Sequence, residues 1–205
     1  YFDLYTQTED SYHTRAWLCG RVTMELFASD KQENLSEYKG DSETDDFLPN
    51  INSEYYFFGV DTKGVLRWDQ NTIKLGNVDK PLNLVIIVTK TTPISYLAYL
   101  RKKEISYIFA GDDQIDFTIL FSKIREKFNI KTLILEGGAI LNGNVIESGF
   151  VDELSLILIP MVVNDSKAPS LFENTNDSDK RLHNFKLVGI EKLENSCLWL
   201  KYIKE

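Results

Sequence analysis

Cysteine, basic charge and long apolar runs are all scarce in this chain of 205 residues. Its two cysteines, Cys19 and Cys197, lie in different apolar segments without the spacing of metal ligands, which predicts two buried free thiols and no metal site. Acidic side chains outnumber basic ones by 31 to 23, and the net charge of −8 argues against nucleic acid or an anionic membrane as a partner.

The longest apolar run is interrupted at Pro160 and is too short to span a bilayer. The sequence shows no signal-peptide pattern, so we expect a cytoplasmic protein. A hydrophobic content of 43% is typical of a soluble chain with one sizeable core, and we expect residues 1–205 to form a single domain. An anionic ligand would then be held by backbone dipoles, because the surface is not basic.

Apolar strand patterns and helical patterns alternate along the middle of the chain. The expected strands are residues 16–19, 55–60, 84–88, 107–110 and 132–135. The expected helices cover residues 8–16, 21–25, 93–100 and 117–128 and a short stretch after Gly138. This alternation predicts an α/β fold with a mainly parallel central sheet and helices on both faces.

Two of these helices have recognisable start signals. Thr92 is expected to cap a helix with Pro93 at its first position, and its buried stripe would be Ile94, Leu97 and Leu100. Asp116 is expected to cap the next helix, which has a regular apolar stripe from Phe117 to Phe128.

The tail of the chain follows another pattern. Residues 154–163 are expected to form a strand and residues 164–181 a polar loop. Residues 185–193 and 198–203 predict an antiparallel C-terminal hairpin that finishes the sheet. Residues 29–52 are polar and acidic and predict a long loop.

The most informative turn is Glu136-Gly137-Gly138, where an expected strand passes into an expected helix. Adjacent glycines let a ligand approach the backbone, and the N–H groups at a helix start favour an anion such as a phosphate. The alternative is a tight turn that binds nothing. Further turns follow other expected strands at residues 20–23, 61–64 and 89–92 and at Gly111, and in a parallel sheet these ends converge.

Five blocks of residues carry a resemblance to a known family. They are residues 16–25 (AWLCGRVTME), 60–68 (VDTKGVLRW), 105–111 (ISYIFAG), 135–143 (LEGGAILNG) and 149–156 (GFVDELSL). In this order and spacing the chain, from about Ala16 to its end, resembles the reductase domain of riboflavin biosynthesis, which belongs to the dihydrofolate-reductase-like superfamily.

The resemblance implies a dihydrofolate-reductase-like fold, NADPH as the cofactor and a homodimer. It implies a reductase of a pyrimidine- or pterin-like small molecule, similar to 5-amino-6-(5-phosphoribosylamino)uracil reductase. In such enzymes a hydride from the nicotinamide reduces the ribosylamino group of a phosphorylated pyrimidine, and the protein mainly orients the two bound molecules.

Matched position by position, Thr23 would bind the cofactor from a helix start, Thr62 would lie near its adenosine, and residues 138–144 would wrap its phosphates. Glu136 would face the substrate as the catalytic carboxylate. The full set of cofactor candidates is Gly20, Arg21, Thr23, Thr62, Thr89, Gly111, Gly137, Gly138, Ala139, Ile140, Leu141 and Asn142.

Several of these assignments have a structural alternative. Glu136 could simply bind neighbouring amides at its strand end. Arg21 and Lys90 are candidates for the 2′-phosphate of the cofactor or are solvated surface charges. Trp68 either stacks on a ligand ring or packs in the core. Asp152 and Glu153 are matched too, and a structural role before the next strand is expected for both of them.

The sequence departs from the family pattern at two places. The family opens with an apolar strand and a Ser-x-Asp-Gly-like turn, and the printed sequence carries no such strand before Ala16, so substrate contacts from it are not assigned. Residues 24–27 (MELF) are mainly apolar where the riboflavin enzymes have charged residues. Two other functions therefore stay open: a reductase of an unrelated carbonyl or imine, and a non-catalytic nucleotide-binding protein.

Overall fold

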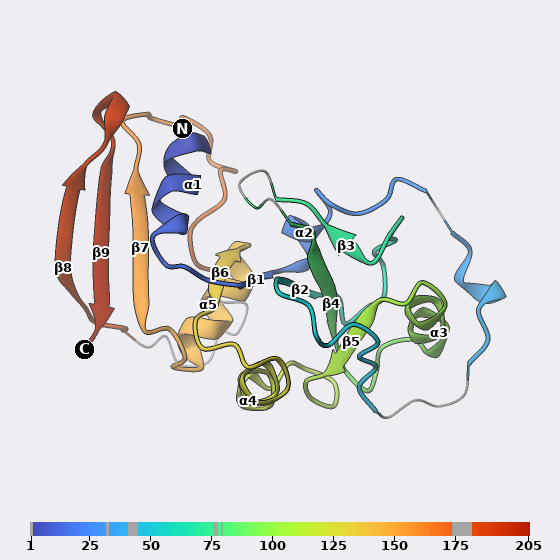
Figure 1. Ribbon diagram of the computed structural model, residues 1–205. Coiled ribbons are helices and arrows are strands. Elements are labelled where there is room, and N and C mark those ends of the chain that lie inside the picture. The colour runs from blue at the N-terminus through green and yellow to red at the C-terminus, as the bar shows by residue number, and fades with distance from the viewer. Residues whose placement is uncertain (1, 32, 41–44, 76–77, 79, 174–181) are drawn as a thin grey trace. The chain divides into compact units, whose positions relative to one another are not determined.

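A computed structural model describes the whole chain except residues 1, 32, 41–44, 76–77, 79 and 174–181. The chain divides into two compact units (Figure 1). The parallel-sheet unit is Thr14–Gly138, and the antiparallel-sheet unit combines Tyr1–His13 with Ala139–Glu205. That residues 1–205 act as one domain stays a prediction, and each unit is described by itself.

The parallel-sheet unit contains a six-stranded sheet. Its strands are β1 (Ala16–Cys19), β2 (Tyr56–Val60), β3 (Thr72–Ile73), β4 (Leu82–Val88), β5 (Ser106–Phe109) and β6 (Ile134–Gly137). Its helices are α2 (Arg21–Met24), the 3-10 helix η1 (Leu35–Glu37), α3 (Ile94–Lys102) and α4 (Phe117–Phe128). The order is β3-β4-β2-β1-β6, with β5 also paired to β4. Every pair except β3–β4 is parallel, as the alternating pattern predicts.

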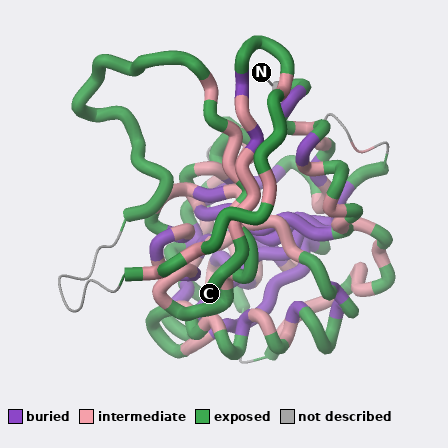
Figure 2. The backbone as a smooth tube through the Cα atoms, turned by 90° about the vertical axis from the view of Figure 1, so that its left-hand side faces the viewer, coloured by how far each residue is buried: buried purple, intermediate pink, exposed green. Residues whose placement is uncertain are grey.

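Helices cover both faces of this sheet. All seven residues of β4 are buried, which explains why its sequence is an almost unbroken apolar run (Figure 2). On one face, Phe57 and Ile86 pack in the same core cluster as Tyr96 and Leu100 of α3. On the other face, the ring of Phe128 at the end of α4 lies 5.0 Å from that of Tyr56 and 5.2 Å from that of Phe58.

The start of α4 confirms one predicted cap, and the start of α3 shows that the other is wrong. The Asp116 carboxylate accepts hydrogen bonds from the N–H groups of Thr118 (2.8 Å) and Ile119 (3.1 Å). Pro93 occupies the N-cap of α3 and no side chain caps it. Ile94 is exposed, and the buried face of α3 is Tyr96, Leu97, Tyr99 and Leu100.

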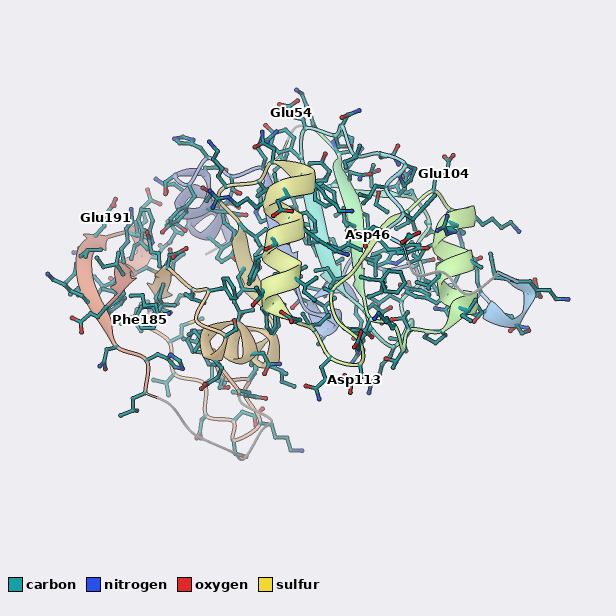
Figure 3. All side chains as sticks on the ribbon, turned by 90° about the horizontal axis from the view of Figure 1, so that it is seen from below. Asp46, Glu54, Glu104, Asp113, Phe185 and Glu191 are labelled. Carbon is teal, nitrogen blue, oxygen red and sulfur yellow. The ribbon has the colours of Figure 1, made fainter. Side chains whose placement is uncertain are left out.

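The acidic loop before β2 is tied to the sheet at Asp46, which is labelled in Figure 3. The Asp46 side chain is only 5% exposed and pairs with Lys123 (2.8 Å) and Lys127 (2.9 Å) of α4. It also accepts a hydrogen bond from the Phe109 N–H at 2.8 Å. Burial alone would raise the pKa of Asp46, but these three hydrogen bonds outweigh it and hold the pKa below its ordinary value.

The antiparallel-sheet unit has its own three-stranded sheet, in the order β7-β9-β8. Its elements are α1 (Phe2–Asp10), α5 (Ala139–Glu147), β7 (Glu153–Leu158), β8 (Phe185–Lys192), the 3-10 helix η2 (Glu194–Ser196) and β9 (Leu198–Lys204). The predicted hairpin is confirmed. Three expectations are wrong: the first helix ends at Asp10, β7 ends at Leu158, and in the described residues these strands form a separate sheet and do not extend the parallel one.

The register of this sheet gathers apolar side chains on one face. Cross-strand partners in the rows are Leu154–Tyr202–Leu187, Leu156–Leu200–Ile190 and Leu158–Leu198–Lys192. We call the eight uncharged residues of these rows, that is all except Lys192, the apolar face. Leu158, Leu187 and Ile190 are 52%, 42% and 63% exposed.

The opposite face is mixed, because Ile157 and the buried Trp199 lie on it beside Glu153 and Ser155. It also carries the turn that follows α1. The Tyr12 hydroxyl donates a hydrogen bond to the Glu153 carboxylate, and the Trp199 indole N–H donates one to Ser155 Oγ at 2.9 Å. Burial and the bond to Glu153 together raise the pKa of Tyr12 to about 12. Glu153 therefore has a structural partner, Tyr12, in the turn after α1, in agreement with its expected structural role. None of the helices that the structure describes is long and apolar enough to cross a membrane.

Candidate functional site

The candidate site lies at one edge of the parallel sheet. Because β1, β2, β4, β5 and β6 run parallel, their carboxyl ends share this edge, where open α/β sheets bind ligands. The residues that follow these strand ends are Gly20, Asp61, Thr89, Ala110 and Gly138. The structure thus brings the turns predicted from the sequence to a common edge.

The turns after β1 and β6 are joined directly. The Gly20 N–H donates a hydrogen bond to the Gly137 carbonyl at 2.7 Å, and the peptide bond between Gly137 and Gly138 is cis. A Cβ placed on Gly138 would meet no atom closer than Thr23 Oγ1, which lies 4.0 Å away. Space beside the Gly138 backbone and the Thr23 hydroxyl is therefore open to ligand atoms.

Glu136 is held at the end of β6. It is half-buried, and its Oε2 accepts a hydrogen bond at 3.5 Å from the thiol of Cys19, the fully buried last residue of β1. This contact fixes one oxygen of the carboxylate at the sheet edge beside Gly20 and Gly137. The predicted role of Glu136 in catalysis stays a prediction.

The turns after β2, β4 and β5 form a second chain of contacts. Thr92 Oγ1 donates to the Thr62 carbonyl at 2.9 Å and accepts from the Thr89 N–H at 3.0 Å. The Lys90 N–H donates to the Gly111 carbonyl at 3.3 Å. The Thr92 hydroxyl thus joins two strand ends, which explains why it does not cap α3.

Gly111 has a structural reason to be glycine that involves no ligand. Its φ is +124°, and a Cβ there would lie 2.0 Å from the Gln114 carbonyl oxygen. Its predicted contact with a cofactor is therefore not needed to account for the residue.

A pocket of about 530 Å³ opens beside α2 and the turn that follows β2. It combines cationic, acidic and apolar side chains, and it is lined by Arg21, Glu25, Ala28, Ser29, Asp30, Lys63, Val65, Leu66 and Arg67. Only Arg21 of these was predicted. Lys63 could have been found from its place directly after Thr62 in the turn at the end of β2.

The three cations of the pocket differ in what they already contact. Arg67 donates hydrogen bonds to the carbonyls of Glu33, Gly64 and Leu66 and lies over the ring of Tyr99 at 5.6 Å. Arg21 forms an ion pair with Glu25, one helical turn along. Lys63 is exposed and forms no ion pair with a described residue.

Lys90, the other predicted phosphate ligand, does not line the pocket. Its ammonium lies 2.6 Å from the Asp112 carboxylate, and both side chains are largely exposed. Trp68 is also absent from the pocket wall. It is 2% exposed and its indole N–H donates to the Tyr96 hydroxyl at 3.4 Å, which supports the core-packing interpretation.

The remaining cofactor candidates, Ala139–Asn142, begin helix α5 of the antiparallel-sheet unit. Ile140 is 48% exposed and Leu141 is buried. Asn142 Nδ2 donates to the Leu171 carbonyl at 3.0 Å, and the Ala139 carbonyl accepts from the Glu173 N–H at 2.9 Å. Their predicted binding of cofactor phosphates stays a prediction.

The segment Leu171–Glu173 runs against α5 at Gly143. A Cβ on Gly143 would lie 2.1 Å from the Glu173 carbonyl oxygen, so this contact requires glycine. In the part of the chain that the structure describes, no group of three or more His, Cys, Asp and Glu side chains is placed to hold a metal ion.

Comparison with known families identifies the family of this chain. Residues 60–199 match the model of the RibD C-terminal domain. The chain belongs to the RibD C-terminal domain family. The resemblance seen in the five sequence blocks is thereby confirmed.

Two curated relatives are named 2,5-diamino-6-ribosylamino-4(3H)-pyrimidinone 5′-phosphate reductase. The one from Aquifex aeolicus is 31% identical over 87 residues, which are 42% of this chain and 38% of the relative. The one from Methanothermobacter thermautotrophicus is 33% identical over 89 residues, or 43% and 40%. The matched segment thus spans about two fifths of each relative.

Solved structures agree on the fold. A pyrimidine reductase-like protein from Corynebacterium diphtheriae superposes with a TM-score of 0.67 at 15% identity, covering 94% of this chain and 76% of that one. RibD from Acinetobacter baumannii gives 0.63 at 15% identity, covering 98% and 51%. The predicted dihydrofolate-reductase-like fold is confirmed.

Proposed function

We propose that this chain is an NADPH-dependent reductase of a phosphorylated, pyrimidine- or pterin-like small molecule. One observation carries the proposal: in a member of the RibD C-terminal domain family, a pocket containing Arg21 and Lys63 lies at the sheet edge that holds the open turn at Gly138. The names of the two curated relatives support the reaction class and the phosphorylated pyrimidine substrate.

The residues of this edge fit a phosphorylated dinucleotide. Arg21 and Lys63 would hold the 2′-phosphate on the adenosine ribose, because both cations line one pocket. The open space at Gly138 would take the pyrophosphate against the backbone, with the Thr23 hydroxyl as a donor. When bound, such a cofactor supplies a hydride to the substrate.

We assign Glu136 to the substrate. The bond from the buried Cys19 thiol fixes one carboxylate oxygen, and the carboxylate can accept a hydrogen bond from a sugar hydroxyl or from the reacting nitrogen. Its task would be to orient the group that receives the hydride, which contributes through positioning. Loss of its charge should therefore act on turnover and not on cofactor binding.

The proposal includes a homodimer that buries the apolar face of the antiparallel sheet. Three of its side chains are more than 40% exposed, and the register adds a single charged residue, Lys192, to its three rows. A two-fold axis would place the same apolar patch of two copies against each other, as isologous interfaces require.

Calorimetric titration with NADPH and NADH tests the proposal. Gly138→Ala should weaken NADPH at least about tenfold, a loss of about 1.4 kcal/mol, because the new methyl group occupies the ligand's space and meets no protein atom closer than 4.0 Å. Gly189→Ala is the control, since its Cβ would make only an ordinary contact of 3.6 Å with Lys201. Equal NADPH affinity in the wild type and a folded Gly138→Ala variant would overturn this placement.

The same protein allows the role of Glu136 to be separated from binding. Glu136→Gln should slow turnover of a pyrimidine substrate by about tenfold to a thousandfold. Its NADPH affinity should stay within about threefold of the wild type. The glutamine keeps the size and a hydrogen-bonding oxygen of the side chain, and Glu136 is assigned to the substrate and not to the cofactor. Turnover at the wild-type rate would leave Glu136 as a structural carboxylate.

A further inference from the structure

The pocket beside α2 contains acidic as well as basic side chains, and its two carboxylates are those of Glu25 and Asp30. Glu25 lines the pocket and forms an ion pair with Arg21, which is one of the two cations available there. The two side chains are 41% and 49% exposed, and the Glu25 N–H also donates to the Arg21 carbonyl at 3.1 Å. The backbone at the end of α2 therefore keeps the two side chains one helical turn apart.

The third cation of the pocket, Arg67, is already bound to other groups of the protein. The guanidinium of Arg67 is bonded to three backbone carbonyls and lies over the ring of Tyr99, so it forms the wall of the pocket. An incoming phosphate then depends on Lys63, which has no ion pair among the described residues, and on Arg21, which must first leave Glu25.

We infer that Glu25 sets the selectivity of this pocket between a phosphorylated and an unphosphorylated ribose. This inference rests on the proposed function. The Arg21–Glu25 pair is exposed, so a doubly charged phosphate can displace it at little cost. The displaced carboxylate remains beside the phosphate and repels it, whereas a ribose hydroxyl carries no charge and can donate a hydrogen bond to the same oxygen atoms.

Two probes that differ by a single phosphate measure this selectivity. Adenosine 2′,5′-bisphosphate and adenosine 5′-monophosphate are titrated into the full chain by calorimetry at low ionic strength. Glu25→Gln should tighten the bisphosphate about three- to tenfold and should change the monophosphate less than about twofold. At high salt the gain should shrink, because screening weakens the repulsion that the substitution removes.

Asp112→Asn is the matched control. It neutralises a carboxylate that is paired with Lys90 at the same sheet edge but is not part of the pocket wall. It changes the net charge of the protein by the same amount as Glu25→Gln, so it controls for the effect of overall charge on anion binding. It should alter the affinity of neither probe.

The outcomes distinguish the role of Glu25 from the placement of the cofactor. Binding of the bisphosphate to the wild type with an unchanged affinity ratio in Glu25→Gln would overturn the role of Glu25 and leave the proposed function standing. A selective gain in Asp112→Asn instead would assign the phosphate to Lys90 and would also overturn it. Failure of the wild type to bind either probe would overturn both the inference and the cofactor placement.

Discussion

All seven residues of β4 in the parallel sheet are buried, whereas β8 of the antiparallel sheet has no buried residue among its eight. The first strand is covered on both faces by helices and neighbouring core residues, so its stability comes from packing within the unit. The second belongs to a sheet whose apolar face is partly exposed. The comparison shows that the parallel sheet is stabilised by packing within its unit, whereas the antiparallel sheet leaves apolar side chains such as Leu158 and Ile190 exposed.

The largest expected effect contrasts the two units directly. Phe57→Ala empties a fully buried position in the parallel-sheet core and should lower the free energy of unfolding by about 3–5 kcal/mol. Val188→Ala, at the bulge of β8 and 52% exposed, should cost less than about 0.5 kcal/mol. Chemical denaturation measures both, and similar losses in the two variants would remove the contrast.

The next prediction concerns the apolar face. Ile190→Asp places a charge in its middle row and should raise the dimer dissociation constant at least about a hundredfold, or about 2.7 kcal/mol. Light scattering should then give a mass near 23.6 kDa, against twice that value for the wild type. Val188→Asp makes the same change outside the face and should remain dimeric. A wild-type protein that is monomeric at micromolar concentration would contradict the proposed homodimer.

A smaller effect is expected at Asp46, which ties the acidic loop to β5 and α4. Asp46→Asn should lower the free energy of unfolding at pH 7 by about 2 kcal/mol, because hydrogen bonds to a charged and nearly buried group are lost. Asp113→Asn, at an exposed position in the loop after β5, is the control and should be neutral.

The pH dependence of that effect follows from the lowered pKa of Asp46. A carboxyl group whose pKa is lower in the folded state stabilises the fold above its ordinary pKa, and the contribution is lost as the pH falls through the folded value. The difference between the wild type and Asp46→Asn should therefore be full at pH 7 and shrink in acid. A difference that is constant from pH 7 to pH 3 would show that the charge of Asp46 is not its source.

The smallest effect is expected at Tyr12 in the antiparallel-sheet unit. Its pKa of about 12 lies above the ordinary value of 10.0, so its stabilising effect is complete below pH 10 and declines as the pH rises towards 12. In Tyr12→Phe the free energy of unfolding should fall less at alkaline pH than in the wild type. The difference should be less than about 1 kcal/mol, because the pair with Glu153 is largely exposed to solvent. Denaturation at pH 8 and pH 11 compares the two proteins.

The parts of the fold that were predictable are those with a local physical signal. The unbroken apolar run of β4 and the Asp116 cap of α4 both follow from side chains that act within a few residues of their own position. The first helix was misplaced because residues 8–16 contain a weak helical pattern, and the chain leaves the helix after Asp10 to reach β1. The two-residue strand β3 exists only because β4 lies beside it.

The candidate site was predictable as a set of turns and not as a pocket. Glycines at the ends of β1 and β6 indicate where the backbone can be approached. The choice between Arg21 and Lys90 could not be made from the sequence, because both follow strand ends, and only the fold shows that Arg21 lines the pocket while Lys90 pairs with Asp112. Lys63 could have been proposed from its place after Thr62 in the turn that follows β2, but only the fold shows that this turn lines the pocket.

The contact between Gly143 and Glu173 limits how this sequence can vary. Since any β-carbon at position 143 would overlap the Glu173 carbonyl oxygen, a change at 143 has to be accompanied by a different path of residues 171–173. In related chains, residue 143 and the segment that corresponds to residues 171–173 should therefore change together. Chains with glycine at position 143 should keep this segment against α5. Chains with a larger residue there should carry an insertion or deletion in the connection between β7 and β8.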